Sequence, residues 1–83
     1  MFITYISYNS KRNEFQIGVT MNLQRRKKIL CNQAPACKIV WYEEYENSEQ
    51  ATGRENELLD FPKELLKELV FETNPMLTDL DIN

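Results

Sequence analysis

The sequence predicts an α+β fold in which a small, mainly antiparallel three-stranded sheet is flanked by helices, in the order ββαβαα. Two patterns predict this class: three runs rich in β-branched and aromatic residues, and later segments with apolar residues at helical spacing. The length of 83 residues, 42% of them hydrophobic, allows one core, so we expect a single domain over 1–83.

The first two strands are expected to form an antiparallel hairpin. Residues 2–8 read FITYISY and are β-branched or aromatic, and residues 14–19 alternate apolar and polar side chains. The polar segment at 9–13 is short enough to be a hairpin turn.

The register of this hairpin decides which residues share a face. We expect paired residue numbers to sum to 21, which places Tyr5 opposite Gln16 and Ile3 opposite Gly18. A glycine inside a strand weakens it and commonly marks the close approach of a backbone or a ligand.

Capping residues and apolar spacing mark the remaining elements. These are a helix from Thr20 or Asn22 to about residue 31, a strand over 37–46, a helix over 48–60, a helix over 62–72, and a docked or frayed tail over 72–83. Asn47 and Gln50 form the pattern of a capping box, and Pro62 suits the first turn of the last helix.

Each of the last two helices carries an apolar stripe that we expect to face the core. The stripes are Ala51, Leu58 and Leu59 in the first, and Leu65, Leu66, Leu69 and Val70 in the second.

A carboxylate interrupts the stripe of the helix over 48–60, because Glu55 lies four residues after Ala51. A carboxylate that faces a core is costly unless it is paired, hydrogen-bonded or bound to a cation. Either Glu55 belongs to a functional site, or it lies at the edge of the stripe and reaches water, with a salt bridge to Arg25 or Arg54.

The composition excludes several kinds of chemistry. The chain contains no histidine, which excludes Ser-His and Cys-His triads and His-ligated metals. Cys31 and Cys37 alone make a poor zinc site, and we expect them to be reduced thiols in a cytoplasmic protein. No apolar run approaches the ~20 residues of a membrane span, and the first residues lack the pattern of a signal peptide, so no membrane partner is expected.

The net charge of −3 is unevenly distributed. Residues 1–38 carry seven basic and one acidic side chain, whereas residues 39–83 carry three basic and twelve acidic ones. This asymmetry indicates either a basic binding face on an acidic body or two halves that fold together and largely neutralise each other.

Several short motifs follow one another along the chain. They are Ile3-Thr4-Tyr5, Gln16-Ile17-Gly18-Val19-Thr20, Asn22-Leu23-Gln24-Arg25-Arg26, Trp41-Tyr42-Glu43-Glu44, Arg54-Glu55 and Asn74-Pro75. This ordered set resembles the GIY-YIG endonuclease superfamily, most closely its small single-domain members. The resemblance covers residues 2–80.

The resemblance implies a DNA endonuclease that hydrolyses phosphodiester bonds with one divalent cation, Mg²⁺ or Mn²⁺. It implies catalytic positions for Tyr5, Gln16 and Arg26, the metal-binding position for Glu55, and structural positions near the site for Gly18 and Asn74. Gln16 stands where the family normally has a tyrosine.

DNA is the expected partner. Its phosphates are expected to contact five basic residues: Lys11, Arg12, Arg25, Lys27 and Lys28. Four consecutive basic residues on a helix cannot all point one way. The alternative interpretation is therefore that most of the basic residues at 25–28 are solvated and have no binding role.

The chemistry of these side chains fits hydrolysis, with one weakness. The ordinary pKa of a tyrosine is ~10, so Tyr5 needs the charge of Arg26 or of the cation before it can accept a proton. The amide of Gln16 can orient water but cannot act as a base, which predicts weak or lost turnover. The alternative function is a catalytically inactive nucleic-acid-binding or protein-interaction module that keeps the fold.

Overall fold

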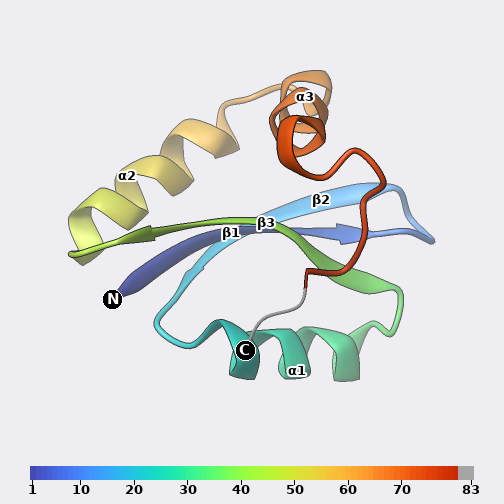
Figure 1. Ribbon diagram of the computed structural model, residues 1–83, viewed down its shortest axis with the longest axis horizontal. Helices are drawn as coiled ribbons and strands as arrows, with labels where there is room; N and C mark the ends of the chain where they lie inside the picture. Colours follow the sequence, from blue (N-terminus) through green and yellow to red (C-terminus); the bar gives the residue numbers. More distant parts are fainter. Residues whose placement is uncertain (81–83) are drawn as a thin grey trace.

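The computed structural model describes residues 1–80, which fold as a sheet between two helical layers (Figure 1). Its elements are β1 (Phe2–Asn9), β2 (Glu14–Thr20), α1 (Leu23–Gln33), β3 (Cys37–Tyr45), α2 (Ser48–Leu59) and α3 (Lys63–Thr73). The sheet is antiparallel throughout, with strand order β2-β1-β3. The predicted α+β class and the order ββαβαα are therefore confirmed.

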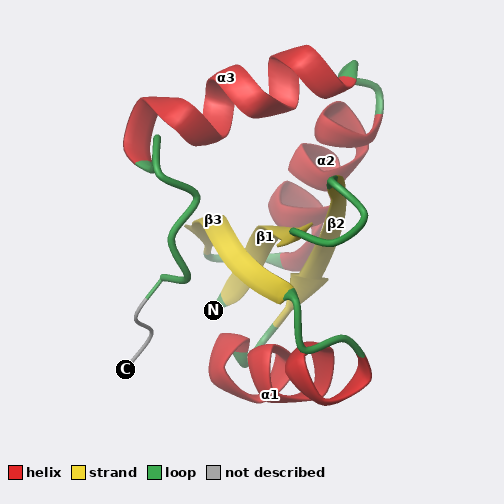
Figure 2. Ribbon diagram, turned by 90° about the vertical axis from the view of Figure 1, so that its right-hand side faces the viewer, coloured by secondary structure: helices red, strands yellow, loops and turns green. Residues whose placement is uncertain are grey.

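The two faces of the sheet pack against different helices (Figures 1 and 2). On one face, Tyr5 and Ile39 pack with Leu23 of α1. On the other, Ile6 and its neighbours pack with α2 and α3; the buried members of this core are Ile6, Val40, Trp41, Leu58, Leu66 and Val70. Because β1 is central and covered on both faces, its residues Thr4–Ser7 are all buried.

The observed hairpin register differs from the expected one by two residues. Tyr5 lies opposite Gly18, and Gln16 lies opposite Ser7. The reason is the turn, which is wider than expected: Asn9 still pairs with Glu14, and Asn13 closes the loop with a left-handed φ of 53° that asparagine tolerates. Because side chains alternate with a period of two, the slip leaves Tyr5, Gln16 and Gly18 on one face.

Gly18 marks a close approach, as expected, but the approaching group is a side chain. The ring of Tyr5 lies over Gly18, and a Cβ atom at position 18 would be 2.5 Å from the Tyr5 Oη and 2.7 Å from its Cζ. Only a residue without a side chain allows Tyr5 this position.

Side-chain caps fix the starts of α1 and α2. The Asn22 Oδ1 accepts a hydrogen bond from the Arg25 N–H at 3.0 Å, and the Asn47 Oδ1 accepts one from the Gln50 N–H at 2.9 Å. α1 extends two residues beyond its expected end, and Pro62 occupies the N-cap of α3 instead of its first turn. None of the helices within 1–80 has the length and apolar run needed to cross a bilayer.

The apolar stripes of α2 and α3 are narrower than expected. Leu59 is 60% exposed and Leu65 is 44% exposed, so the prediction that they face the core is wrong. Each is one residue away in sequence from a buried leucine, and one residue turns a helix by about 100°. The buried positions are Ala51 and Leu58 in α2, and Leu66 and Val70 in α3.

The C-terminal tail is docked along the free edge of β3 as far as residue 80. The Leu80 N–H donates to the Ile39 carbonyl at 3.0 Å, and the Ile39 N–H donates to the Asp79 Oδ1 at 3.2 Å. The buried Asn74 begins this tail: its Nδ2 donates to the Val40 carbonyl at 3.1 Å and to the Thr78 carbonyl at 2.8 Å. Residues 81–83 of the expected tail lie outside the described residues.

Substituting Gly18→Ala tests the Tyr5–Gly18 contact. Because the new methyl group would overlap the buried Tyr5 ring, we expect the free energy of unfolding to fall by about 1–3 kcal/mol. Gly53→Ala is the matched control, since no atom lies within 4 Å of a Cβ there, and alanine in a helix should add about 0.5–1 kcal/mol. Urea unfolding measures both; equal effects of the two substitutions would contradict the packing described.

Candidate functional site

Tyr5 is the centre of the candidate site. It is 5% exposed in the central strand β1, with its ring over Gly18 of the edge strand β2. In the described part of the chain its hydroxyl makes no hydrogen bond, and no fully buried side-chain oxygen or nitrogen lacks a partner. The tip of the hydroxyl therefore reaches solvent, although the ring beneath it is buried.

Three influences set the pKa of Tyr5. Burial raises this pKa above the ordinary 10.0, and it outweighs the guanidinium of Arg26, which lowers it; the carboxylate of Glu55 raises it further. The phenol is therefore protonated at neutral pH. The charge of Arg26 alone does not turn Tyr5 into a base.

Arg26 and Glu55 come from different layers and act on the same hydroxyl. Arg26 belongs to α1 and Glu55 to α2, which cover opposite faces of the sheet (Figure 2). The hydroxyl of Tyr5 lies over an edge strand, so side chains of both layers can approach it around that edge. α2 is held beside β1 by a hydrogen bond of 2.8 Å from the Thr4 hydroxyl to the Ala51 carbonyl, one turn before Glu55.

The alternative salt bridge of Glu55 is not formed. Arg54 instead pairs with Glu43 at 3.1 Å and with Glu57 at 3.3 Å, and its guanidinium lies 5.7 Å from the centroid of the Trp41 ring. Among residues 1–80, no cation pairs with Glu55, which is half-buried on the same stripe as Ala51. Its carboxylate is thus available to an external cation.

A cation at Glu55 would have a single protein carboxylate as its ligand, which suits a hydrated hard cation. Within the described ranges, no three His, Cys, Asp or Glu side chains cluster as metal ligands. A single carboxylate can hold Mg²⁺ or Mn²⁺ when waters and a substrate phosphate complete the coordination shell.

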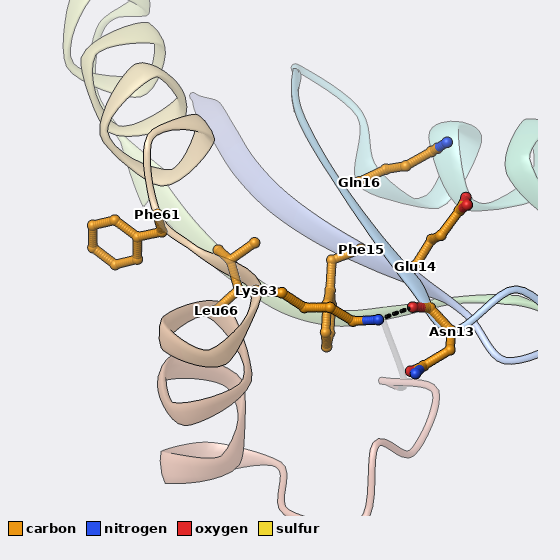
Figure 3. Close-up of a pocket in the computed structure, with 7 residues that line it drawn as sticks. All are labelled: Asn13, Glu14, Phe15, Gln16, Phe61, Lys63 and Leu66. Atoms are coloured by element: carbon orange, nitrogen blue, oxygen red, sulfur yellow. Dashed lines mark hydrogen bonds between the residues drawn. The ribbon is translucent and has the colours of Figure 1, made fainter.

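Gln16 is exposed on β2 and lies diagonally from Tyr5, two residues beyond Gly18. Figure 3 shows its side chain projecting away from Phe15 and Leu66, although all three residues line a hollow of about 430 Å³ between β2 and α3. A diagonal neighbour on one face is within reach of a long side chain. Gln16 can thus approach the Tyr5 hydroxyl but is not directly opposite it.

Asn74 lies at the other edge of the sheet from Gly18. It bonds to Val40 of β3, and the whole of β1 separates β3 from β2. Its hydrogen bonds hold the tail, so its role is structural, as expected. The expected position near Tyr5 is wrong, because Asn74 lies at the β3 edge of the sheet.

The five basic residues do not form one patch. Lys11 and Arg12 lie in the hairpin loop, which contacts the segment after α1 through the Ser10 N–H and the Ala36 carbonyl at 3.2 Å. Arg25 is in the first turn of α1, at the opposite end of that helix. Lys27 is engaged by the tail, at 3.0 Å from Asp79 and 3.1 Å from the Leu80 carbonyl. Arg25 and Lys28 remain exposed on α1.

A hollow of about 400 Å³ beside Arg26 was not expected from the sequence. It is lined by Thr20, Met21, Asn22, Arg25, Arg26 and Ile29. Met21 lies in the loop between β2 and α1, where the spacing of residues does not indicate which side chains lie together. Ile29 could have been found, because it lies three residues after Arg26 on one face of α1.

No protein-family model matches the chain, and searches of curated proteins and of solved structures gave no significant match. The assignment of a function therefore depends on the geometry of the site and on the motifs of the sequence.

The pKa of Tyr5 tests whether the three side chains share one environment. Removing the guanidinium in Arg26→Gln should raise this pKa, and removing the carboxylate in Glu55→Gln should lower it. A ¹³C NMR titration of labelled tyrosine Cζ atoms measures it, with Tyr5→Phe assigning the signal. As controls, Arg25→Gln and Glu57→Gln remove neighbouring charges and should leave the pKa of Tyr5 unchanged. If none of the four substitutions changes this pKa, the three side chains do not share one environment and the candidate site is refuted.

Proposed function

We propose that this chain is a GIY-YIG-type, metal-dependent DNA endonuclease-like protein that hydrolyses phosphodiester bonds with Tyr5, Arg26 and Glu55. One observation carries the proposal: a guanidinium and a carboxylate, neither paired with another described residue, both act on the solvent-reaching hydroxyl of Tyr5. A phenol influenced by two charged groups from different layers is a candidate for a functional site. The order of the sequence motifs supports the same class.

In phosphodiester hydrolysis, a water oxygen bonds to phosphorus while the bond from phosphorus to a sugar oxygen breaks. The water loses one proton, and the leaving sugar oxygen gains one. Arg26 would bind a non-bridging phosphate oxygen with its planar guanidinium and so hold the phosphate beside Tyr5. Glu55 would hold the divalent cation, which supplies positive charge that stabilises the charge developing on the phosphate.

Tyr5 and Gln16 would handle the water. The Tyr5 hydroxyl reaches solvent over Gly18 and can hold a water molecule, and the Gln16 amide can orient it from the next position on the same face. Because burial keeps Tyr5 protonated, proton uptake from the water needs positive charge beyond that of Arg26. We therefore propose slow turnover.

A catalytically inactive nucleic-acid-binding module is the second candidate, and two observations favour it. Gln16 provides no second phenol, and the pKa of Tyr5 is raised instead of lowered. Such a module would bind DNA through the exposed Arg25 and Lys28 of α1 without forming product.

Cleavage of DNA with Mn²⁺ or Mg²⁺ tests the first candidate. We expect plain, nicked or branched duplexes to be cut by the wild-type chain, and Glu55→Ala and Arg26→Ala to lower the rate by about 100-fold or more. Glu49→Ala is the matched control, since it removes an exposed carboxylate from the first turn of the same helix.

Cleavage that persists in Glu55→Ala would identify a contaminating nuclease and refute the proposal. DNA binding without any product, sensitive to salt and to Arg25→Ala with Lys28→Ala, would establish the second candidate instead.

The pH dependence of cleavage follows from the raised pKa of Tyr5. If the deprotonated phenol accepts the proton, its fraction grows with pH up to a pKa above 10.0, so the rate should rise about tenfold per pH unit between pH 6 and 9. A quenched-flow or gel assay over this range measures the slope. The Tyr5→Phe variant should cleave slowly, at a rate that does not change with pH. A pH profile as steep as that of the wild-type chain would exclude Tyr5 as the base.

A further inference from the structure

The hollow beside Arg26 combines cationic and apolar walls. Arg25 and Arg26 line it from α1, and no acidic residue contributes to its lining. Among residues 1–80, neither guanidinium forms an ion pair, so both are available to an anion. The N–H of Arg25 is already bonded to the Asn22 Oδ1, so the positive charge offered here is that of the side chains.

The apolar wall is formed by Met21 and Ile29, which are 68% and 38% exposed. Neither residue belongs to the core clusters of the fold. Together with the two guanidinium groups they line a space of about 400 Å³, which is the size of a small-ligand site. A ligand that carries both an apolar group and an anionic group matches this lining.

The position of the hollow relates it to the candidate site. Thr20 lines the hollow, and it lies two residues after Gly18 on the same face of β2, a separation of about 6–7 Å. Arg26 belongs to both places. A ligand in the hollow would thus be the immediate neighbour of a phosphate held at the Tyr5 hydroxyl.

We propose that this hollow binds one unpaired nucleotide next to the phosphate at Tyr5, with its base against Met21 and Ile29 and its own phosphate on Arg25. The inference rests on the proposed function for the adjoining phosphate and adds the class of substrate. In a duplex the flat faces of the bases are stacked on one another, so an apolar wall can reach only base edges and the backbone. A splayed or single-stranded base presents a flat apolar face, whose contacts stabilise binding without sequence preference. The favoured substrate is DNA with a single-stranded segment.

Binding of short oligonucleotides in EDTA tests this inference without cleavage. Fluorescence anisotropy should show that a labelled oligothymidine binds more tightly than a blunt duplex of equal length. Met21→Ser with Ile29→Ser should weaken binding of the single strand about tenfold and change binding of the duplex by less than about twofold. An oligonucleotide whose nucleotides are all abasic offers the hollow no base in any register. It should bind the wild-type chain as weakly as the variant binds oligothymidine.

The matched control is Leu59→Ser with Met76→Ser, which removes two exposed apolar residues from elsewhere on the surface. Equal losses for single strand and duplex, no loss for either, or no binding of oligothymidine by the wild-type chain would overturn the inference. The cleavage test on Glu55→Ala is independent of these results. Binding of the single strand without cleavage would refute the nuclease function and support the nucleotide site in the hollow. Cleavage that does not depend on Met21 and Ile29 would support the nuclease function and refute the nucleotide site.

Discussion

The stacking of the Tyr5 ring on the bare backbone of Gly18 is the constraint on which the rest of the candidate site depends. It carries a hydroxyl from the middle strand of the sheet to the rim of β2, where α1 and α2 can both influence it. A side chain at position 18 would displace the ring and separate that hydroxyl from Arg26 and Glu55. The same contact explains why a buried tyrosine ends in solvent, and why its acidity is governed first by burial and only then by charge.

The elements of the fold could be predicted because their signals are local. Caps such as Asn22 and Asn47 are read from a few neighbouring residues, and their side chains bond as the pattern indicated. The hairpin register could not be predicted, because it depends on the number of residues in the turn. Asn13 extends that turn by adopting a left-handed conformation. The exposure of Leu59 and Leu65 depends on the space left between layers, which helical spacing does not reveal.

The candidate site could be predicted in part. Glu55 is detectable as a carboxylate on an apolar stripe, whereas Tyr5 and Arg26 are indicated by the family resemblance. Three relations between residues were not evident from the sequence. Lys27 is held by Asp79 from the far end of the chain, the basic residues divide between the two ends of α1, and Met21 and Ile29 line the same hollow. The first two depend on how segments distant in sequence come together, and the third includes Met21, which lies outside any helix or strand.

The docking of the tail on β3 has a consequence for self-association. Strands at the rim of a sheet present unsatisfied backbone groups that can recruit another chain, and indefinite stacking needs such a rim on both sides. Here Asp79 and Leu80 occupy the backbone of Ile39, and Asn74 occupies that of Val40. The tail thus blocks the addition of a further strand over the Ile39–Val40 part of the β3 edge.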